Sequence, residues 1–156
     1  MFGELIGLCL AQTWMDQGQP ASFTLAEAGP GRGTLMADIL RATGQVPGFG
    51  AAAQGVLIEA SERLRQVQGE TLPGAEPIFI KTLDDLPDAP LYLVANEFFD
   101  ALPVRQFQRG QHHWHERMVG LSEGDLSFGL GPETPQPALA DRLADTEPGN
   151  LVEYCP

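Results

Sequence analysis

FTLAEAGPGRGTLMADIL, residues 23–40, has the order of a strand, a glycine-rich turn and a helix. The apolar opening predicts a strand over residues 23–26, Glu27 follows it, and glycines then alternate at positions 29, 31 and 33. Glycine allows positive φ and lets a ligand approach the backbone without meeting a Cβ atom. The following helix presents free N–H groups and the positive end of its dipole to the turn. The pattern therefore predicts a site for a nucleotide-like ligand, held by its sugar and its polar tail.

The turn has the pattern E-x-G-x-G-x-G, which differs from two better-known phosphate-binding turns. No Lys-Ser or Lys-Thr follows Gly33, so a triphosphate site is disfavoured. The third glycine comes one residue early for the dinucleotide pattern G-x-G-x-x-G, which leaves a nicotinamide-nucleotide domain as the weakest alternative. The pattern resembles motif I of S-adenosylmethionine-dependent methyltransferases. An ordinary strand-to-helix turn stays open as another interpretation, because glycine and proline mark turns of every kind.

The composition is that of an acidic globular chain. Its 156 residues suffice for one domain with a core, and 43% of them are hydrophobic. The net charge of −12 and the scattered arginines disfavour nucleic-acid binding. No apolar run approaches the ~18 residues that a membrane span needs, and we find no targeting segment. Cys9 falls in an apolar helical pattern, which predicts a small buried side chain.

After a loop predicted at Pro47, Gly48 and Gly50, a second apolar run also ends in a carboxylate. GVLIE, residues 55–59, predicts a parallel strand that brings Glu59 to the same sheet edge as Glu27. There the carboxylate can accept hydrogen bonds from both ribose hydroxyls, and a surface acid at a strand end is the alternative. A third short strand is predicted at 78–80. In the acidic loop that follows, Asp84 or Asp85 could meet an adenine amine or be solvated.

The run LYLVA, residues 91–95, predicts a fourth strand that leads into NEFFD, residues 96–100. Methyl transfer needs in-line approach of a nucleophile to a sulfonium methyl in a dry pocket. A guanidinium nucleophile must also be oriented and neutralised, which a carboxylate achieves by bidentate pairing. Glu97 and Asp100 are the candidates for this role, and Asn96 could position the backbone or the amino acid tail. The alternative is a helix start, with Asn96 as its cap and the acids complementing the helix dipole.

Residues 104–130 predict an antiparallel β-meander inserted after the fourth strand. The segment 131–156 is Pro-rich and predicts a last strand at 151–154. The sequence HHWH, residues 112–115, would alternate across a strand, and too few other His or Cys residues are available to close a zinc site. We therefore expect exposed strand histidines and no metal.

Four stretches in chain order together resemble the MidA family: FTLAEAGPGRGTLMADILR, LIEASERLRQVQ, LVANEFFDALPVRQF and WHERMVGL. This family of methyltransferase-like proteins includes the mitochondrial complex I assembly factor that methylates an arginine. The match spans the chain, and ANEFFDALPVRQF is its most specific part. The resemblance implies an α/β, class I methyltransferase-like (Rossmann-like) fold and S-adenosylmethionine as methyl donor. It also implies protein arginine methylation for the mitochondrial members.

The resemblance also implies roles for individual residues. The cofactor's amino acid end would be lined by Glu27, Gly29, Gly31 and Gly33. Its ribose would be bound by Glu59, with Asp85 as the candidate contact to the base. The methyl-transfer side would be faced by Asn96, Glu97 and Asp100.

Because the resemblance implies a longer chain and a seven-stranded sheet, we expect a single partial methyltransferase domain over residues 1–156. Its expected parts are a leading helix at 1–20, a βαβ cofactor-binding core at 21–103, the meander at 104–130 and the tail with its last strand at 131–156. The fourth strand would then be an exposed sheet edge, through which the chain could self-associate. Catalysis by such a fragment alone is doubtful.

These observations predict an S-adenosylmethionine-dependent methyltransferase that acts on a protein arginine. A respiratory complex I subunit or its bacterial counterpart would be the substrate, in the mitochondrial matrix or the bacterial cytoplasm. The alternative is a non-catalytic assembly or interaction module that keeps the methyltransferase fold.

Overall fold

A computed structural model describes residues 1–155 and divides the chain into two compact units. The first unit ends at Asp100 and the second begins at Ala101, close to the expected boundary between core and meander after residue 103. Among the described residues, no helix has both the length and the apolar character needed to cross a membrane.

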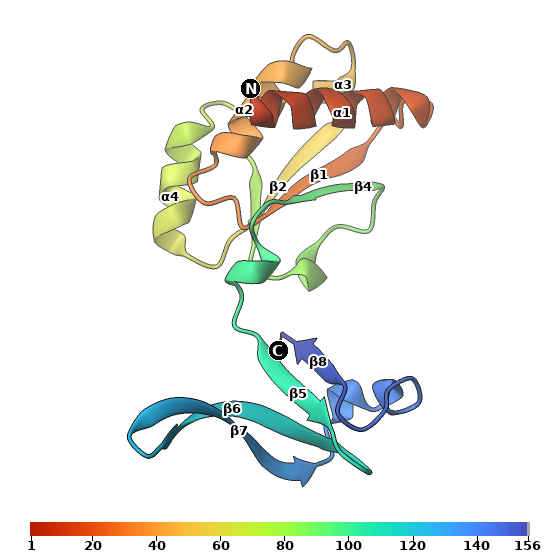
Figure 1. Cartoon of the computed structure of the whole chain (residues 1–156). Coiled ribbons are helices and arrows are strands. Elements are labelled where there is room, and N and C mark those ends of the chain that lie inside the picture. The colour runs from red at the N-terminus through yellow and green to blue at the C-terminus, as the bar shows by residue number, and fades with distance from the viewer. Residues whose placement is uncertain (156) are drawn as a thin grey trace. The chain divides into compact units, whose positions relative to one another are not determined.

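The first unit is a four-stranded parallel sheet with helices (Figure 1). The strand order is β3-β2-β1-β4, and the strands are β1 (Phe23–Ala28), β2 (Ala53–Ile58), β3 (Ile78–Ile80) and β4 (Leu91–Ala95). The helices are α1 (Phe2–Asp16), α2 (Thr34–Thr43), α3 (Phe49–Ala52) and α4 (Glu62–Thr71), with 3₁₀ turns η1 (Leu83–Asp85) and η2 (Phe99–Ala101). This confirms the predicted α/β fold with a parallel sheet, and β4 lies at the edge of that sheet as expected.

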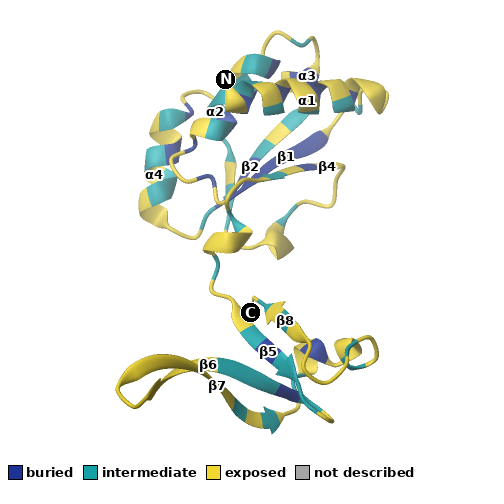
Figure 2. Ribbon diagram, viewed as in Figure 1, coloured by how far each residue is buried: buried dark blue, intermediate teal, exposed yellow. Residues whose placement is uncertain are grey.

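The centre of the sheet is β1, whose six residues are all buried (Figure 2). Its neighbours β2 and β4 pair with it on both sides. A parallel strand covered on both faces has no solvent side, so an apolar run suits it better than alternation does. Glu27 is the one acid in this run, and its burial in the central strand marks it as a residue kept for a reason other than packing.

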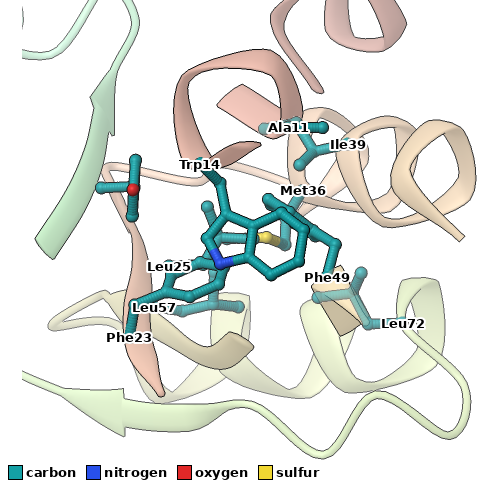
Figure 3. Packing of buried hydrophobic residues seen from close by; sticks show 10 residues of the cluster. Ala11, Trp14, Phe23, Leu25, Met36, Ile39, Phe49, Leu57 and Leu72 are labelled. Carbon is teal, nitrogen blue, oxygen red and sulfur yellow. The ribbon is translucent and has the colours of Figure 1, made fainter. Parts of the chain in front are cut away.

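Aromatic rings fill the core between the sheet and the helices (Figure 3). Trp14 of α1 meets Phe49 edge-on at 5.5 Å between centroids, and Phe23 meets Phe49 at 5.1 Å and Tyr92 at 4.9 Å. The Trp14 indole N–H donates to the carbonyl of Pro20 at 3.0 Å, so its polar group is satisfied. These contacts fix α1 and β1 together, and hence the strand that leads into the glycine turn.

Three local predictions were wrong. The segment predicted as a loop around residues 47–50 leads into the short helix α3, where Phe49 is fully buried. Cys9 is exposed on α1, because the buried side of that helix carries Gly3, Gly7, Ala11 and Trp14. The first strand continues past Ala26 to Ala28, which brings Glu27 inside the sheet.

The second unit is an antiparallel sheet of order β7-β6-β5-β8. Its strands are β5 (Arg105–Arg109), β6 (Trp114–Ser122), β7 (Asp125–Thr134) and β8 (Leu151–Tyr154), with 3₁₀ turns η3 (Pro137–Leu139) and η4 (Asp141–Leu143). Phe107, Trp114 and Leu139 form its small core. The structure confirms the predicted meander and last strand, and it adds the antiparallel pairing of β8 with β5.

Only part of the histidine run lies in a strand, since β6 begins at Trp114 and includes His115. His112 and His113 precede β6, and both of their backbone N–H groups donate to Glu133 Oε1 at 2.7 Å. These two charge-assisted bonds, with Coulombic help from His115 and His112, hold the pKa of Glu133 below its usual range. The segment is therefore a turn closed by a carboxylate, which periodicity alone does not reveal.

Candidate functional site

The carboxyl ends of β1 and β2 meet at one edge of the parallel sheet. Ala28 pairs with Ile58 in register, and the Gly29 N–H donates to the Ile58 carbonyl at 3.3 Å. Glu59 follows Ile58 directly, and its N–H donates to the carbonyl of Ile80 at the end of β3. The acid inside β1 and the acid after β2 therefore flank the glycine turn, as the two apolar runs predict.

All three glycines of the turn have positive φ, with values of 64°, 54° and 80° at Gly29, Gly31 and Gly33. Their surroundings differ. A Cβ atom at Gly29 would stand 2.5 Å from Phe98 Cδ2, and one at Gly33 would stand 3.3 Å from Gln68 Cγ. A Cβ atom at Gly31 would meet nothing within 4 Å. Side chains therefore fill the space beside Gly29 and Gly33, at the two ends of the turn. The space beside Gly31 is open, so a ligand can reach the backbone there.

Glu27 is buried near the end of β1 and is only 3% exposed. Burial raises the pKa of its carboxyl to about 7, and the hydrogen bond from the Met36 backbone N–H opposes that rise. Its Oε2 atom is buried without a hydrogen-bond partner among residues 1–155. A buried, unpartnered carboxylate oxygen beside a helix N-terminus is suited to a donor from outside the chain, such as a ligand ammonium or hydroxyl group.

The carboxylate of Glu59 is held by two donors of the chain. Oε1 accepts from the Ser61 backbone N–H at 2.7 Å, and Oε2 accepts from Gln68 Nε2 at 3.3 Å. Gln68 Nε2 also donates to the carbonyl of Gly31 at 2.8 Å. Gln68 therefore links Glu59 to the middle of the glycine turn.

The residues after β4 are solvent-exposed in the first unit. Asn96, Glu97 and Asp100 are all exposed, and Asn96 follows Ala95, which pairs with Ala28 of β1. Glu97 has φ of 51°, an uncommon value for a residue with a side chain. Phe98 anchors this segment against Gly29. The predicted alternative of a helix beginning at Asn96 is not seen, because only the 3₁₀ turn Phe99–Ala101 forms.

Asp85 has a local structural role. Its Oδ2 accepts from the Thr82 hydroxyl at 3.0 Å and from the Thr82 backbone N–H at 3.2 Å, which closes the turn η1. These bonds lower the pKa of the Asp85 carboxyl. The contact of Asp85 with a base stays a prediction, and the neighbouring Asp84 is exposed on the same turn.

Two residues that frame the site were missed by sequence reasoning: Gln68 and Arg65. Arg65 donates to the carbonyl of Glu59 from Nε at 2.7 Å and to the carbonyl of Ile80 from Nη2 at 3.1 Å, so it ties the ends of β2 and β3 together. The signal for Gln68 was available, because a glutamine at helical spacing between Leu64 and Leu72 occupies a position where an apolar residue is expected. Arg65 carried no such signal.

These groups fit a nucleoside that carries a polar tail. Open backbone at Gly31, an orphaned oxygen on Glu27 and the two-oxygen acceptor of Glu59 lie on one sheet edge. No lysine lies in or next to the turn, so the chemistry of the donor set does not favour a triphosphate.

The chain matches a family model described as "Putative S-adenosyl-L-methionine-dependent methyltransferase" over residues 5–156. It is 33% identical to the human "Protein arginine methyltransferase NDUFAF7, mitochondrial" and 35% identical to the rat protein of that name. These alignments cover 100% of this chain but only 41% of the human and 42% of the rat protein. The chain thus spans about two fifths of the length of these relatives.

Two crystal structures of proteins from Burkholderia thailandensis share the fold. One superposes with a TM-score of 0.65 at 26% identity and covers 99% of this chain and 41% of that protein. The second, bound to S-adenosyl-homocysteine, has a TM-score of 0.60 at 25% identity and covers 99% of this chain and 40% of that protein.

Proposed function

The chain belongs to this family of S-adenosyl-L-methionine-dependent methyltransferases, and we propose that it forms the cofactor-binding part of a protein arginine methyltransferase. The observation that carries the proposal is the glycine turn, with its middle open at Gly31 and an acid on each side. When bound, S-adenosylmethionine supplies an electrophilic methyl group on a sulfonium sulfur.

Glu27 and Glu59 have different tasks in this proposal. Glu27, with an unpartnered oxygen, accepts from the ammonium group of the cofactor's amino acid tail. The charge of that ammonium favours the ionised carboxylate and so works against the raised pKa of Glu27. Glu59 accepts from the two ribose hydroxyls, and its carboxylate keeps acceptor capacity for them beside the bonds it already makes.

We assign the acceptor arginine to the segment after β4. Glu97 and Asp100 are exposed acids, and each can pair with a guanidinium group through two N–H···O bonds. Such pairing orients the nucleophilic nitrogen and offsets its charge, which is the assistance that methyl transfer needs from the protein. Asn96 lies nearest to β1 among the three and is assigned to the cofactor's tail.

Cofactor binding is tested by calorimetric titration of the chain with S-adenosylhomocysteine. The deciding variant is Gly31→Ala, whose added methyl group would project into the open space of the turn. The matched control is Gly18→Ala, because Gly18 has φ of 83° and also has nothing within 4 Å of an ideal Cβ. Both variants carry the same backbone strain, of about 1 kcal/mol, at an L residue with positive φ. We expect Gly31→Ala alone to lose binding, and a wild-type chain without measurable binding would refute the proposal.

For the acceptor, we propose an arginine of a respiratory complex I subunit or of its bacterial counterpart. The chain's charge of −12 favours association with a basic segment. The test is mass spectrometry of candidate subunits incubated with labelled methyl donor and the full-length protein, with Glu97→Gln as the deficient variant. Label on lysine or on a carboxylate, or label that Glu97→Gln leaves unchanged, would refute the assignment.

A non-catalytic interaction module is the second candidate, and the hairpin of β6 and β7 favours it. Val119 pairs with Phe128 and Leu121 with Leu126, which places four exposed apolar side chains on one face. Figure 2 shows this hairpin largely in the colour of exposed residues. Apolar surface of this kind commonly marks a protein contact. Partner capture that survives Glu59→Gln and Glu97→Gln together but is lost with Leu121→Ser and Phe128→Ser would favour this candidate.

A further inference from the structure

The side chain of Gln68 is fully buried in the second turn of α4, at 0% exposure. Its one amide nitrogen donates to two groups that are distant in sequence, the carbonyl of Gly31 at 2.8 Å and Oε2 of Glu59 at 3.3 Å. The same side chain packs beneath Gly33, where a Cβ atom would stand 3.3 Å from Gln68 Cγ. One residue thus contacts the glycine turn at two points and the acid after β2.

Packing does not explain a glutamine at this position. Leu64 of α4 and Leu72, the residue that follows the helix, are each four residues from Gln68, so an apolar side chain would continue the stripe. The Oε1 atom of Gln68 has no partner among residues 1–155, and an unsatisfied buried acceptor destabilises a fold. The orientation of the amide follows from its neighbours, since a flipped amide would direct Oε1 at two acceptors and leave both without a donor.

The bond from Gln68 adds a second anchor to the carboxylate of Glu59. The Ser61 N–H, at the N-cap of α4, holds one oxygen and the Gln68 amide, two turns further along that helix, holds the other, so two donors set the plane of the carboxylate. A carboxylate has about four acceptor sites, which leaves capacity on each oxygen for a further donor. Two neighbouring hydroxyl groups of a ribose present donors in a matching side-by-side arrangement.

We propose that Gln68 is a positioning residue that holds Glu59 and the Gly31 carbonyl in the arrangement that receives the ribose. The inference rests on the proposed cofactor function. It assigns to Gln68 no contact with the cofactor and no proton transfer. The amide of Gln68 donates its hydrogen bonds to groups of the chain, and Gln68 affects the ligand only through Glu59.

The test compares Gln68→Met with the wild-type chain by calorimetric titration with S-adenosylhomocysteine. Methionine keeps the length and volume of the side chain and removes the donor. Because Glu59 is half-buried and Gly31 is exposed, water can replace the lost bonds, so we expect little change in melting temperature. Affinity should fall by about tenfold, the loss typical of one charge-assisted hydrogen bond. Gln66→Met, an exposed position on the same helix, is the matched control and should bind as the wild type does.

A double-mutant cycle with Glu59→Gln separates positioning from general stabilisation. In that background the change Gln68→Met should cost less than about twofold, because the group it positions is already altered. An equal loss in both backgrounds, or a lower melting temperature with unchanged affinity, would overturn the inference while leaving the cofactor proposal intact. A wild-type chain that does not bind would overturn both.

Discussion

The ring of Phe98 packs against Gly29, so closely that a Cβ atom at position 29 would stand 2.5 Å from Phe98 Cδ2. Gly29 begins the turn after β1, and Phe98 belongs to the segment that follows β4. The contact brings the segment of Asn96 and Glu97 to the glycine turn without a hydrogen bond between them. Glycine is therefore needed at position 29 both for its φ of 64° and for the space that the ring occupies.

Gly29→Ala should destabilise the first unit for both reasons. Gly18→Ala introduces comparable backbone strain without a neighbouring ring, so it measures the cost of a positive φ alone. We expect Gly29→Ala to lower the free energy of unfolding by about 1–2 kcal/mol more than Gly18→Ala does, as measured in urea. Adding Phe98→Ala should recover part of that excess, since the clash is then absent. A strictly additive double variant would show that the ring moves away at no cost.

The buried Glu27 predicts a specific pH dependence of stability. Because its pKa is about 7 in the folded chain and 4.5 for an ordinary glutamate, the folded state retains a proton that the unfolded chain releases. The corresponding stability is fully present below about pH 4.5 and is lost as the pH rises through about 7. The difference in unfolding free energy between wild type and Glu27→Gln should thus change by about 2–3 kcal/mol between pH 4.5 and pH 8, in the direction that favours the variant at high pH.

This difference is the quantity to measure, because other carboxyl groups titrate in the opposite sense. A hydrogen bond from Arg105 lowers the pKa of Glu116, and bonds from two backbone N–H groups lower the pKa of Glu133. The stability that these two carboxylates contribute to the fold is lost as the pH falls. Glu70→Gln, at an exposed position of α4, is the control for the loss of one glutamate. A flat difference for Glu27→Gln would mean that folding does not shift the pKa of this carboxyl.

Most of the parallel sheet could be predicted from the sequence, because each strand is a short apolar run and the two informative runs end in Glu27 and Glu59. Their meeting at one edge follows from parallel pairing, and the register of Ala28 with Ile58 agrees with it. The helix α3 was missed since four residues show no periodicity, and its Phe49 is recruited by the rings of Trp14 and Phe23.

The residues that surround the site could be predicted less well than its two acids. Gln68 contacts Gly31 across 37 residues of sequence, and Phe98 contacts Gly29 across an even longer separation. Such contacts are fixed by tertiary packing, which local propensity does not encode. The contact of Asp85 with Thr82 is local instead, because the two residues are three apart in the sequence. A capping pattern in the sequence would have revealed it.

Arg65 should contribute more to the free energy of unfolding than an ordinary surface arginine does. It donates to the carbonyls of Glu59 and Ile80, and its guanidinium lies 5.6 Å from the centroid of the Phe79 ring. Arg65→Met keeps much of the packing and removes the donors, and we expect a loss of about 1–2 kcal/mol in urea unfolding. Arg63→Met on the exposed side of the same helix should change stability by less than about 0.5 kcal/mol. Equal effects of the two substitutions would show that the ends of β2 and β3 hold together without Arg65.

Two helical glycines should respond to alanine with opposite signs. Gly7 faces α2, where a Cβ atom would stand 3.0 Å from Ile39 Cα and 3.1 Å from the Ile39 carbonyl oxygen. Because both atoms belong to the backbone, α1 and α2 must separate to admit a methyl group, and this cost should exceed the gain of about 1 kcal/mol in helix propensity. Gly69 of α4 has nothing within 4 Å of an ideal Cβ, so Gly69→Ala should realise that gain. We expect Gly7→Ala to lower and Gly69→Ala to raise the melting temperature measured by circular dichroism, and stabilisation by Gly7→Ala would mean that the two helices are not in close contact in solution.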